Sequence, residues 1–253
     1  DDCRRKAAAG AQMKEESVPM RVVELPVSAT EDRVVGTLDI EAAIRHGRKE
    51  FEAGILAEAN RSILYVDEIN LLDDHIVDIL LDSAAMGVNT VEREGISYAH
   101  PARFVLVGTM NPEEGDIRPQ LLDRFALSVT VTGEREAKDR IEVVKRRIAY
   151  EQDAEGFAAS YREQQEALRE RIERARALLK SVTVADRMLE KAAHISLALG
   201  VDGHRADITL IKAAMANAAF SGRTEVAKED MKAVSRLVLA HRLRRRPTCR
   251  WKV

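Results

Sequence analysis

The sequence predicts an α/β fold that is followed by a separate all-helical part. Two short apolar runs at residues 63–66 and 104–107 are rich in β-branched and aromatic residues, which is typical of buried parallel strands. Residues 21–132 alternate such runs with helical patterns, as layered α/β folds do. The chain after residue 133 contains no convincing strand, and its helical periodicity indicates a small bundle.

The composition is that of a globular protein with a real core. The chain has 253 residues, of which 45% are hydrophobic and 32% charged, and this length suits one large domain or two modest ones. Its net charge of -2 argues against nucleic acid as a partner, because phosphate-tracking surfaces need an excess of cations. No apolar run has the roughly 18 residues of a membrane span. Cys3 and Cys249 form neither a disulfide framework nor a zinc cluster, which favours a reducing, cytoplasmic location.

Several elements are expected on either side of the strands. In the α/β part we expect a helix over residues 72–86, a hairpin over 89–99 that turns near Gly95, and a third strand over 127–131. The helical part is expected to hold helices over the residues 134–149, 163–179, 205–220 and 230–243. We divide the chain into a mobile lead-in at 1–20, a partial α/β core at 21–132, connecting helices at 133–182 and a C-terminal helical domain at 183–253.

Two adjacent carboxylates follow the first predicted strand. Asp67 and Glu68 come directly after the run at 63–66, at the carboxyl edge where open α/β sheets bind ligands. In nucleoside triphosphatases the Asp of such a pair holds Mg²⁺, which prefers oxygen ligands, and the Glu polarises the attacking water. The alternative is a solvated strand end whose acids cap the next helix. Alone, the pair leaves both interpretations open.

Two further polar groups favour the catalytic interpretation. Asn111 follows the run at 104–107, and its amide could hydrogen-bond the attacking water or a γ-phosphate; it could also simply start a turn before Pro112. Arg124 lies beside Asp123 on a predicted short apolar helix and could deliver positive charge across a subunit boundary. The alternative there is a surface ion pair centred on Asp123, worth about 0–1 kcal/mol. The acid pair, Asn111 and Arg124 are far less expected to occur together in this order by chance than any one of them is to occur alone.

At this level of detail the chain resembles the AAA+ ATPase subunit of magnesium and cobalt chelatases, the smaller I-type subunit of a MoxR-related clade. The resemblance extends along most of the sequence. The matching strings are EDRVVGTLDI (31–40), FEAGILA (51–57), LYVDEINLLDDH (64–75), HPARFVLVG (100–108), NPEEG (111–115) and RPQLLDRF (118–125). It implies an AAA+ P-loop NTPase-type parallel sheet core, with its N-terminal part missing, and an all-α helical lid.

The resemblance also implies roles for five residues. Asp67 and Glu68 match the Walker B acids, for Mg²⁺ and for water activation, and Asn111 matches the polar sensor on the neighbouring strand. Arg124 matches the arginine finger that acts on ATP held by the adjacent subunit. Arg205, in GHRADITL (203–210), matches the second sensor arginine of the lid; otherwise it is an ordinary first-turn helix residue. The stretch 36–51 and the hairpin near Gly95 match parts that the ring uses to push on its partner.

The implied function is that of an ATP-hydrolysing ring motor. The cofactors would be ATP and Mg²⁺, and the ring, expected to be a hexamer, would remodel a D-type subunit and a large porphyrin-binding subunit that inserts Mg²⁺ or Co²⁺ into a tetrapyrrole. Its location would be the cytoplasm, or the plastid stroma in a photosynthetic eukaryote. The alternatives left open are a MoxR-like chaperone or regulatory module and a D-type subunit with poor ATPase activity.

One family motif is missing from the chain. The sequence contains no Gly-x-x-x-x-Gly-Lys-Ser/Thr, the loop whose backbone N–H groups and Lys cradle the phosphates. In the family this loop lies before the point that matches residue 1, so we expect the chain to be a fragment that begins after it. The basic stretch 242–246 could contact acidic surfaces, but it is interpreted as a solvated helix end.

Overall fold

The computed structural model describes residues 10, 18–39, 50–93, 96–201 and 203–243. The lead-in at 1–20 falls mostly outside these ranges, as do Cys3 and Cys249. The chain forms two compact units, residues 1–121 and residues 122–253. We describe each unit by itself.

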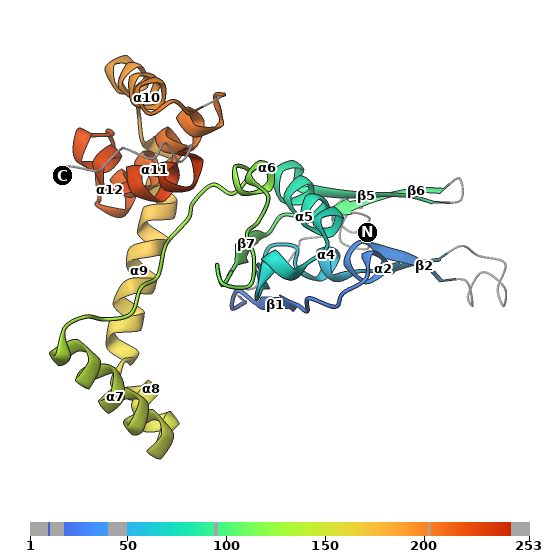
Figure 1. Ribbon diagram of the computed structural model, residues 1–253, viewed down its shortest axis with the longest axis horizontal. Coiled ribbons are helices and arrows are strands. Elements are labelled where there is room, and N and C mark those ends of the chain that lie inside the picture. The colour runs from blue at the N-terminus through green and yellow to red at the C-terminus, as the bar shows by residue number, and fades with distance from the viewer. Residues whose placement is uncertain (1–9, 11–17, 40–49, 94–95, 202, 244–253) are drawn as a thin grey trace. The chain divides into compact units, whose positions relative to one another are not determined.

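The first unit is built on a parallel sheet of three strands. Strands β1 (Val22–Leu25), β4 (Ile63–Val66) and β7 (Val105–Gly108) pair in the order β1-β4-β7 (Figure 1). The first strand run is confirmed as β4, whereas β7 begins one residue later than expected. In the register of β4 with β7, Val66 pairs with Gly108. The two strands therefore end at the same edge of the sheet, next to residues 67 and 109.

Helix α5 (Asp74–Met86) accounts for the apolar pattern expected over residues 72–86. Its N-cap is Asp73, whose Oδ1 accepts the His75 N–H at 2.9 Å, and its C-cap is Gly87, which has a left-handed φ of 69°. The buried face of the helix packs towards β7 and β5. The remaining helical segments of this unit are short: α2 (Glu31–Val35), α4 (Ile55–Glu58), η1 (Ile69–Leu71) and α6 (Pro119–Leu122).

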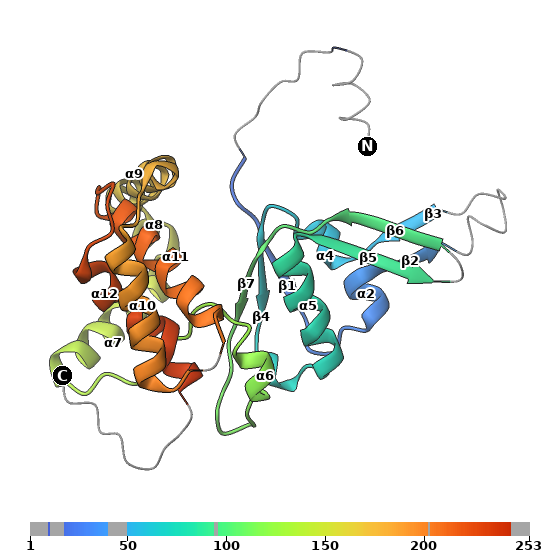
Figure 2. The same ribbon diagram turned by 90° about the horizontal axis from the view of Figure 1, so that it is seen from above.

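Two antiparallel hairpins extend from the first unit, side by side in both views (Figures 1 and 2). One pairs β2 (Gly36–Asp39) with β3 (Glu50–Ala53), and the other pairs β5 (Val88–Arg93) with β6 (Ile96–Pro101). The second confirms the expected hairpin, although the turn residues 94–95 lie outside the described ranges. The ring of Phe51 stacks on that of Tyr98 with centroids 4.1 Å apart, which links the hairpins.

All the named elements of the second unit are helices in the residues that the structure describes, and an isolated β-bridge joins Thr183 to Glu225. Its elements are α7 (Ala137–Gln152), α8 (Ala154–Ser160), α9 (Arg162–Leu178), η2 (Leu179–Ser181), α10 (Asp186–Leu199), α11 (Arg205–Phe220), α12 (Lys228–Leu239) and η3 (Ala240–Arg242). Helix α11 contacts α9, α10 and α12, and its buried alanines Ala206, Ala214 and Ala218 allow close approach. None of the described helices is both long and apolar enough to cross a bilayer.

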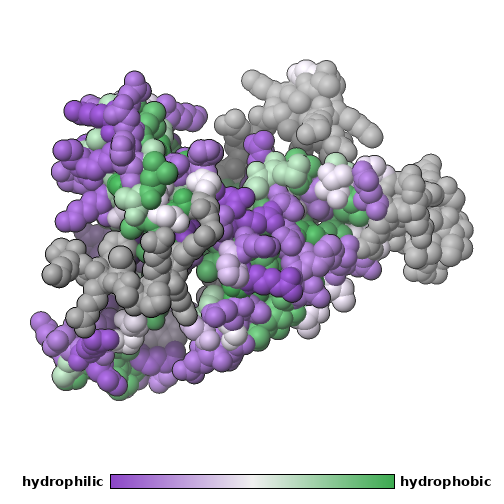
Figure 3. Space-filling model, turned by 45° about the horizontal axis from the view of Figure 1, so that its top comes forward, coloured by the Kyte–Doolittle hydropathy of each residue, from purple (hydrophilic) through white to green (hydrophobic). Residues whose placement is uncertain are grey.

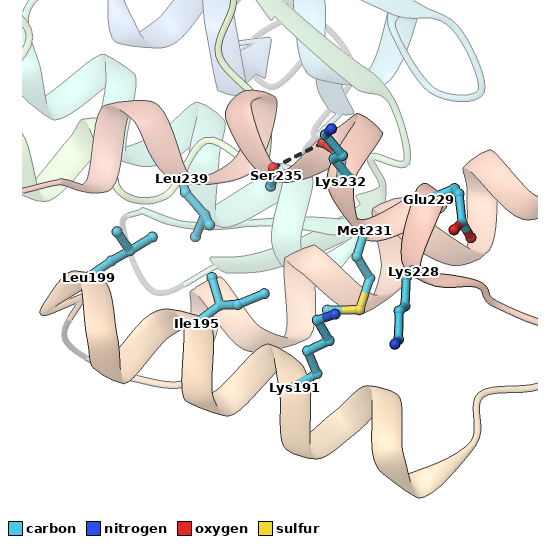
Figure 4. Close-up of a pocket in the computed structure, with 9 residues that line it drawn as sticks. All are labelled: Lys191, Ile195, Leu199, Lys228, Glu229, Met231, Lys232, Ser235 and Leu239. Atoms are coloured by element: carbon cyan, nitrogen blue, oxygen red, sulfur yellow. Dashed lines mark hydrogen bonds between the residues drawn. The ribbon is translucent and has the colours of Figure 1, made fainter. Parts of the chain in front are cut away.

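The surface of each unit mixes polar and apolar side chains. Hydrophobic residues form separate patches among hydrophilic ones on the face shown in Figure 3. On α7, the side chains that share one helical side, Ile141, Val144 and Ile148, are exposed. A groove of about 380 Å³ lies between α10 and α12 (Figure 4). It is lined by Lys191, Ile195, Leu199, Lys228, Glu229, Met231, Lys232, Ser235 and Leu239.

An internal ion pair fixes the start of α12. The fully buried carboxylate of Asp230 accepts hydrogen bonds from Arg223, from Asn217 and from the Ala227 N–H. Burial would raise the pKa of Asp230, but these hydrogen bonds outweigh burial and hold the pKa below its ordinary value. The hydrogen bonds to the Asp230 carboxylate are therefore intact at neutral pH, and their stabilising effect is lost only as the pH falls through the lowered pKa of Asp230.

The strand expected over residues 127–131 does not form. The alternating pattern there is real, but Val129 and Val131 are 69% and 88% exposed, so it buries no face. The Ser128 N–H donates to the Leu237 carbonyl of α12 at 2.8 Å. Residues 127–131 belong to the helical unit. The Ser128 N–H, which a strand would use to pair with a neighbouring strand, is bound to helix α12 instead.

Candidate active site

The carboxylate of Asp67 is held by two hydroxyl groups. The Thr109 Oγ1 donates to Asp67 Oδ1 at 2.5 Å, and the Tyr65 hydroxyl donates to the same oxygen at 3.0 Å. Tyr65 lies on β4, two residues before Asp67, whereas Thr109 follows β7. The pairing of β4 with β7 therefore brings both donors to the carboxylate, and it fixes that group at the edge of the sheet.

These hydrogen bonds favour the charged form of Asp67. The bond from Thr109, and then the bond from Tyr65, hold the pKa of the Asp67 carboxyl below its ordinary value. The same contact with Asp67 raises the pKa of the Tyr65 hydroxyl, so Tyr65 stays a donor. An exposed, ionised carboxylate with one oxygen fixed by hydroxyl groups fits a Mg²⁺ ligand, since Mg²⁺ takes oxygen ligands and keeps several waters.

Glu68 has an unusual backbone conformation. Its φ and ψ are 51° and 49°, the left-handed region that a residue with a side chain occupies only at a cost of about 1–3 kcal/mol. Three hydrogen bonds hold the turn: Glu68 N–H to Thr109 Oγ1 at 3.1 Å, Ile69 N–H to the Thr109 carbonyl at 2.9 Å, and Leu71 N–H to the Glu68 carbonyl at 2.8 Å. Such strain is typical of functional positions. Here it turns the chain sharply between the two acids.

Asn111 lies beyond the same edge of the sheet, three residues after β7 ends. Its side-chain Oδ1 accepts the Glu113 N–H at 3.2 Å, so Asn111 does start a turn at Pro112, the alternative that the sequence left open. The side chain is exposed. Nearby, Asn70 Nδ2 donates to the Gly115 carbonyl at 3.3 Å and ties the loop after Asn111 to the turn after Glu68. Asp67, Glu68 and Asn111 are thus carried by adjoining loops.

Thr109 is predicted to set the charge state of Asp67. Replacing Thr109 with Val removes the hydroxyl that stabilises the charged carboxylate, so the pKa of Asp67 should rise towards its ordinary value. During a titration with acid, Asp67 in the variant should therefore take up its proton at a higher pH than in the unaltered protein. A ¹³C NMR titration of the aspartate carboxyl groups, with Asp67→Asn to assign the signal, measures this pKa. Thr90→Val, on an exposed position of β5, is the matched control. An Asp67 titration that is the same in Thr109→Val would contradict the assignment.

The two candidate arginines, Arg124 and Arg205, lie in the helical unit, and both are next to Asp123: Arg124 follows it in the chain and Arg205 forms an ion pair with it. Helix α6 ends at Leu122, so Arg124 lies in the turn after it rather than on the helix as expected, and it is half-buried. Arg205 is the first residue of α11, and its Nη1 donates to Asp123 Oδ2 at 2.5 Å. The expected surface ion pair at Asp123 is therefore part of a larger network. Its second cation is Arg242, whose Nε donates to Asp123 Oδ1 at 3.2 Å.

Arg242 corrects the interpretation of the basic stretch 242–246. The side chain of Arg242 is 1% exposed, so this residue is not part of a solvated helix end. Residues 244–246 lie outside the described ranges. Sequence reasoning also missed Tyr65 and Thr109, whose roles depend on the pairing of strands that are 42 residues apart in the chain. A tyrosine within a strand and a threonine just after one are each too common to be singled out from the sequence.

Comparisons with known proteins agree with this architecture. The family model "AAA domain (dynein-related subfamily)" matches residues 9–125, and the model "AAA lid domain" matches residues 189–250. A crystal structure from Cytophaga hutchinsonii is 18% identical with a TM-score of 0.62, covers 88% of this chain and 69% of its own, and shares the fold. The chain thus has an AAA-type parallel sheet core and a helical lid.

Two curated relatives are much closer in sequence. The chain is 54% identical over 247 residues to the "Magnesium-chelatase subunit ChlI homolog" of Methanocaldococcus jannaschii, covering 98% of this chain and 67% of the relative. It is 52% identical over 246 residues to the "Magnesium-chelatase 38 kDa subunit" of Acidiphilium rubrum, covering 97% and 71%. The chain thus spans about two thirds of their length. It belongs to the ChlI family of magnesium-chelatase subunits, which are AAA-type ATPase subunits.

Proposed function

We propose that the full-length protein is the ATP-hydrolysing ring motor of a metal chelatase and that Asp67 and Glu68 form the centre of its hydrolysis site. The observation that carries the proposal is the fixed pair of acids at the carboxyl end of β4. Asp67 is oriented and kept ionised by Thr109 and Tyr65, and Glu68 is held in a strained turn directly beside it. An acid pair that served only to cap a helix would not need either feature.

Each residue has a distinct task in this proposal. Asp67 would hold Mg²⁺, which when bound to ATP neutralises charge on the phosphates. Glu68 would accept a proton from the attacking water, and Asn111 would orient that water or the γ-phosphate. Arg205 would reach ATP bound by its own subunit, and Arg124 would reach ATP bound by the neighbour. Positive charge from outside the subunit stabilises a transition state only when the ring is assembled.

In this proposal, the loop that binds the phosphates of ATP is supplied by a part of the full-length protein outside this chain. The family loop with its Gly, Lys and Ser/Thr would lie in the third of the relatives' length that this chain does not span. Its strand would add beside β7, which is an edge strand of the described sheet. The chain by itself is therefore expected to bind ATP weakly.

The partners follow from the family. We infer a homo-oligomeric ring, a hexamer, that acts on a D-type AAA+ subunit and on a large porphyrin-binding subunit, in the cytoplasm or plastid stroma. That large subunit would insert Mg²⁺ or Co²⁺ into the tetrapyrrole. The two hairpins of the first unit, linked through Phe51 and Tyr98, are the elements that would push on these partners.

Reconstitution tests the proposal. The full-length protein is mixed with the D-type and large subunits, ATP, a free-base porphyrin, and either Mg²⁺ or Co²⁺, and metal insertion is followed by porphyrin fluorescence and absorbance. We expect insertion that needs ATP and this protein, with loss of insertion when Glu68→Gln replaces it. ATP hydrolysis with no insertion of either metal, together with capture of a cofactor-dependent dehydrogenase on the immobilised protein, would instead support the MoxR-like alternative.

A further inference from the structure

Every N–H donor of Arg242 is engaged. Its Nε donates to Asp123 Oδ1, its Nη2 group donates to the carbonyls of Asp123 and Phe125 at 3.0 Å and 2.7 Å, and its Nη1 group donates to the carbonyls of Ala126, at 3.2 Å, and Val238. These five bonds equal the five donors that a guanidinium has. Four of the five reach backbone or side-chain oxygens of residues 123–126, more than 110 positions earlier in the chain.

A second side chain binds the same segment. The His241 Nε2 donates to the Phe125 carbonyl at 3.0 Å, while its Nδ1 is buried and has no hydrogen-bond partner in the described part of the chain. Burial, and then the charge of Arg242, lower the pKa of His241, so the imidazole is neutral and keeps its proton on Nε2. His241 and Arg242, in the 3-10 turn η3 that follows α12, therefore bind the carbonyls of residues 123, 125 and 126, on both sides of Arg124.

The segment 123–126 also holds the other candidate arginine. Asp123 uses Oδ1 for Arg242 and Oδ2 for Arg205. Arg242 is almost fully buried, whereas the side chain of Arg205 is 54% exposed. Arg242 is thus the anchored partner of the carboxylate, and Arg205 is the partner at the surface.

We propose that Arg242 is a positioning residue for ATP hydrolysis. It fixes the backbone of residues 123–126 so that Arg124 is presented to the neighbouring subunit. This inference rests on the proposed function, because it assumes that Arg124 acts on the neighbour's ATP. A guanidinium is required because its planar fork can bind several carbonyls at once, whereas an ammonium has three donors and one centre of charge. Misplacing a catalytic group by about 1 Å can cost roughly 100-fold in rate.

A purely structural role would give a different result, and the chain offers a matched control. Arg223 also forms an ion pair with a carboxylate of the helical unit, the buried Asp230, but it does not contact residues 123–126 in the described contacts. Arg242→Lys and Arg223→Lys each keep the positive charge and lose the fork. Both are expected to lower the melting temperature. Only Arg242→Lys should lower kcat, by about 10–100-fold, with little change in KM for ATP.

Mixing subunits separates positioning from folding. In a ring of Arg242→Lys and Glu68→Gln subunits, the Glu68→Gln subunit presents a correctly placed Arg124 to an Arg242→Lys subunit whose own acids are intact. Hydrolysis should then rise above that of either variant alone. An unchanged kcat in Arg242→Lys, or a lowered kcat without recovery in the mixture, would overturn the inference. If Arg242→Lys does not fold, His241→Phe, which loses the donor to Phe125, takes its place under the same criteria.

The parallel mixture of Arg124→Ala with Glu68→Gln keeps the two proposals apart. If that mixture recovers activity and the Arg242→Lys mixture does not, only the role of Arg242 is wrong. If neither recovers, the shared site itself is wrong, and with it the inference for Arg242.

Discussion

Replacing Glu68 with Gln in the full-length protein is expected to lower the turnover number for ATP by about 10²–10⁴-fold, the contribution of a positioned general base. Glutamine has nearly the same shape but accepts no proton from the attacking water. Nucleotide affinity should change little, because Asp67 and its hydrogen bonds with Thr109 and Tyr65 remain. Steady-state hydrolysis gives the turnover number, and titration with a fluorescent nucleotide gives the affinity.

A surface glutamate provides the comparison for this change. Glu58 forms an exposed ion pair with Arg21 at 2.8 Å, so Glu58→Gln removes the same charge from the same unit without touching the acid pair. Its turnover should equal that of the unaltered protein. Hydrolysis that persists in Glu68→Gln at the level of Glu58→Gln would show that another group is the base.

Replacing Arg124 with Ala is expected to have the largest effect, a loss of about 10³–10⁵-fold in turnover if it acts as an arginine finger. The loss arises because the charge that develops on the transferred phosphoryl group is no longer balanced. Equal mixtures with Glu68→Gln should regain part of the activity, since each variant lacks what the other supplies. Turnover of single variants and of mixtures, measured at concentrations where the ring is assembled, provides the test.

Arg187→Ala is the control for the loss of a cation from the helical unit. Arg187 pairs with Glu225 at 3.4 Å, and both side chains are exposed, so the change should leave turnover intact. Size-exclusion chromatography of Arg124→Ala distinguishes lost chemistry from lost assembly. An assembled ring of Arg124→Ala that hydrolyses ATP at the normal rate would remove Arg124 from the site.

The sequence predicted those elements whose cause is local. Residues 63–66 form β4 because an apolar, β-branched run has few alternatives to a buried strand, and residues 205–220 form α11 because alanine recurs at helical spacing. The acid pair could be placed at a sheet edge for the same reason, since it follows directly after a strand. These inferences need only neighbouring residues.

The features that the sequence did not predict depend on distant partners. Alternation at 127–131 indicates a strand, but the Leu237 carbonyl binds the Ser128 N–H and no apolar face is buried. Arg242 stands in a cationic stretch, which usually means exposure, yet carbonyls of residues 123–126 satisfy its donors and allow it to be buried. Thr109 gains its role only through the register of β4 and β7.

The left-handed backbone at position 68 sets activity and robustness against each other. Glycine adopts this conformation without strain, so Glu68→Gly would relieve the backbone while removing the carboxylate. A screen that rewarded only heat resistance is therefore expected to favour Glu68→Gly, although in the proposed function this change removes the general base. If Glu68 is the base as proposed, gains in thermal stability that keep activity have to come from other positions of the chain.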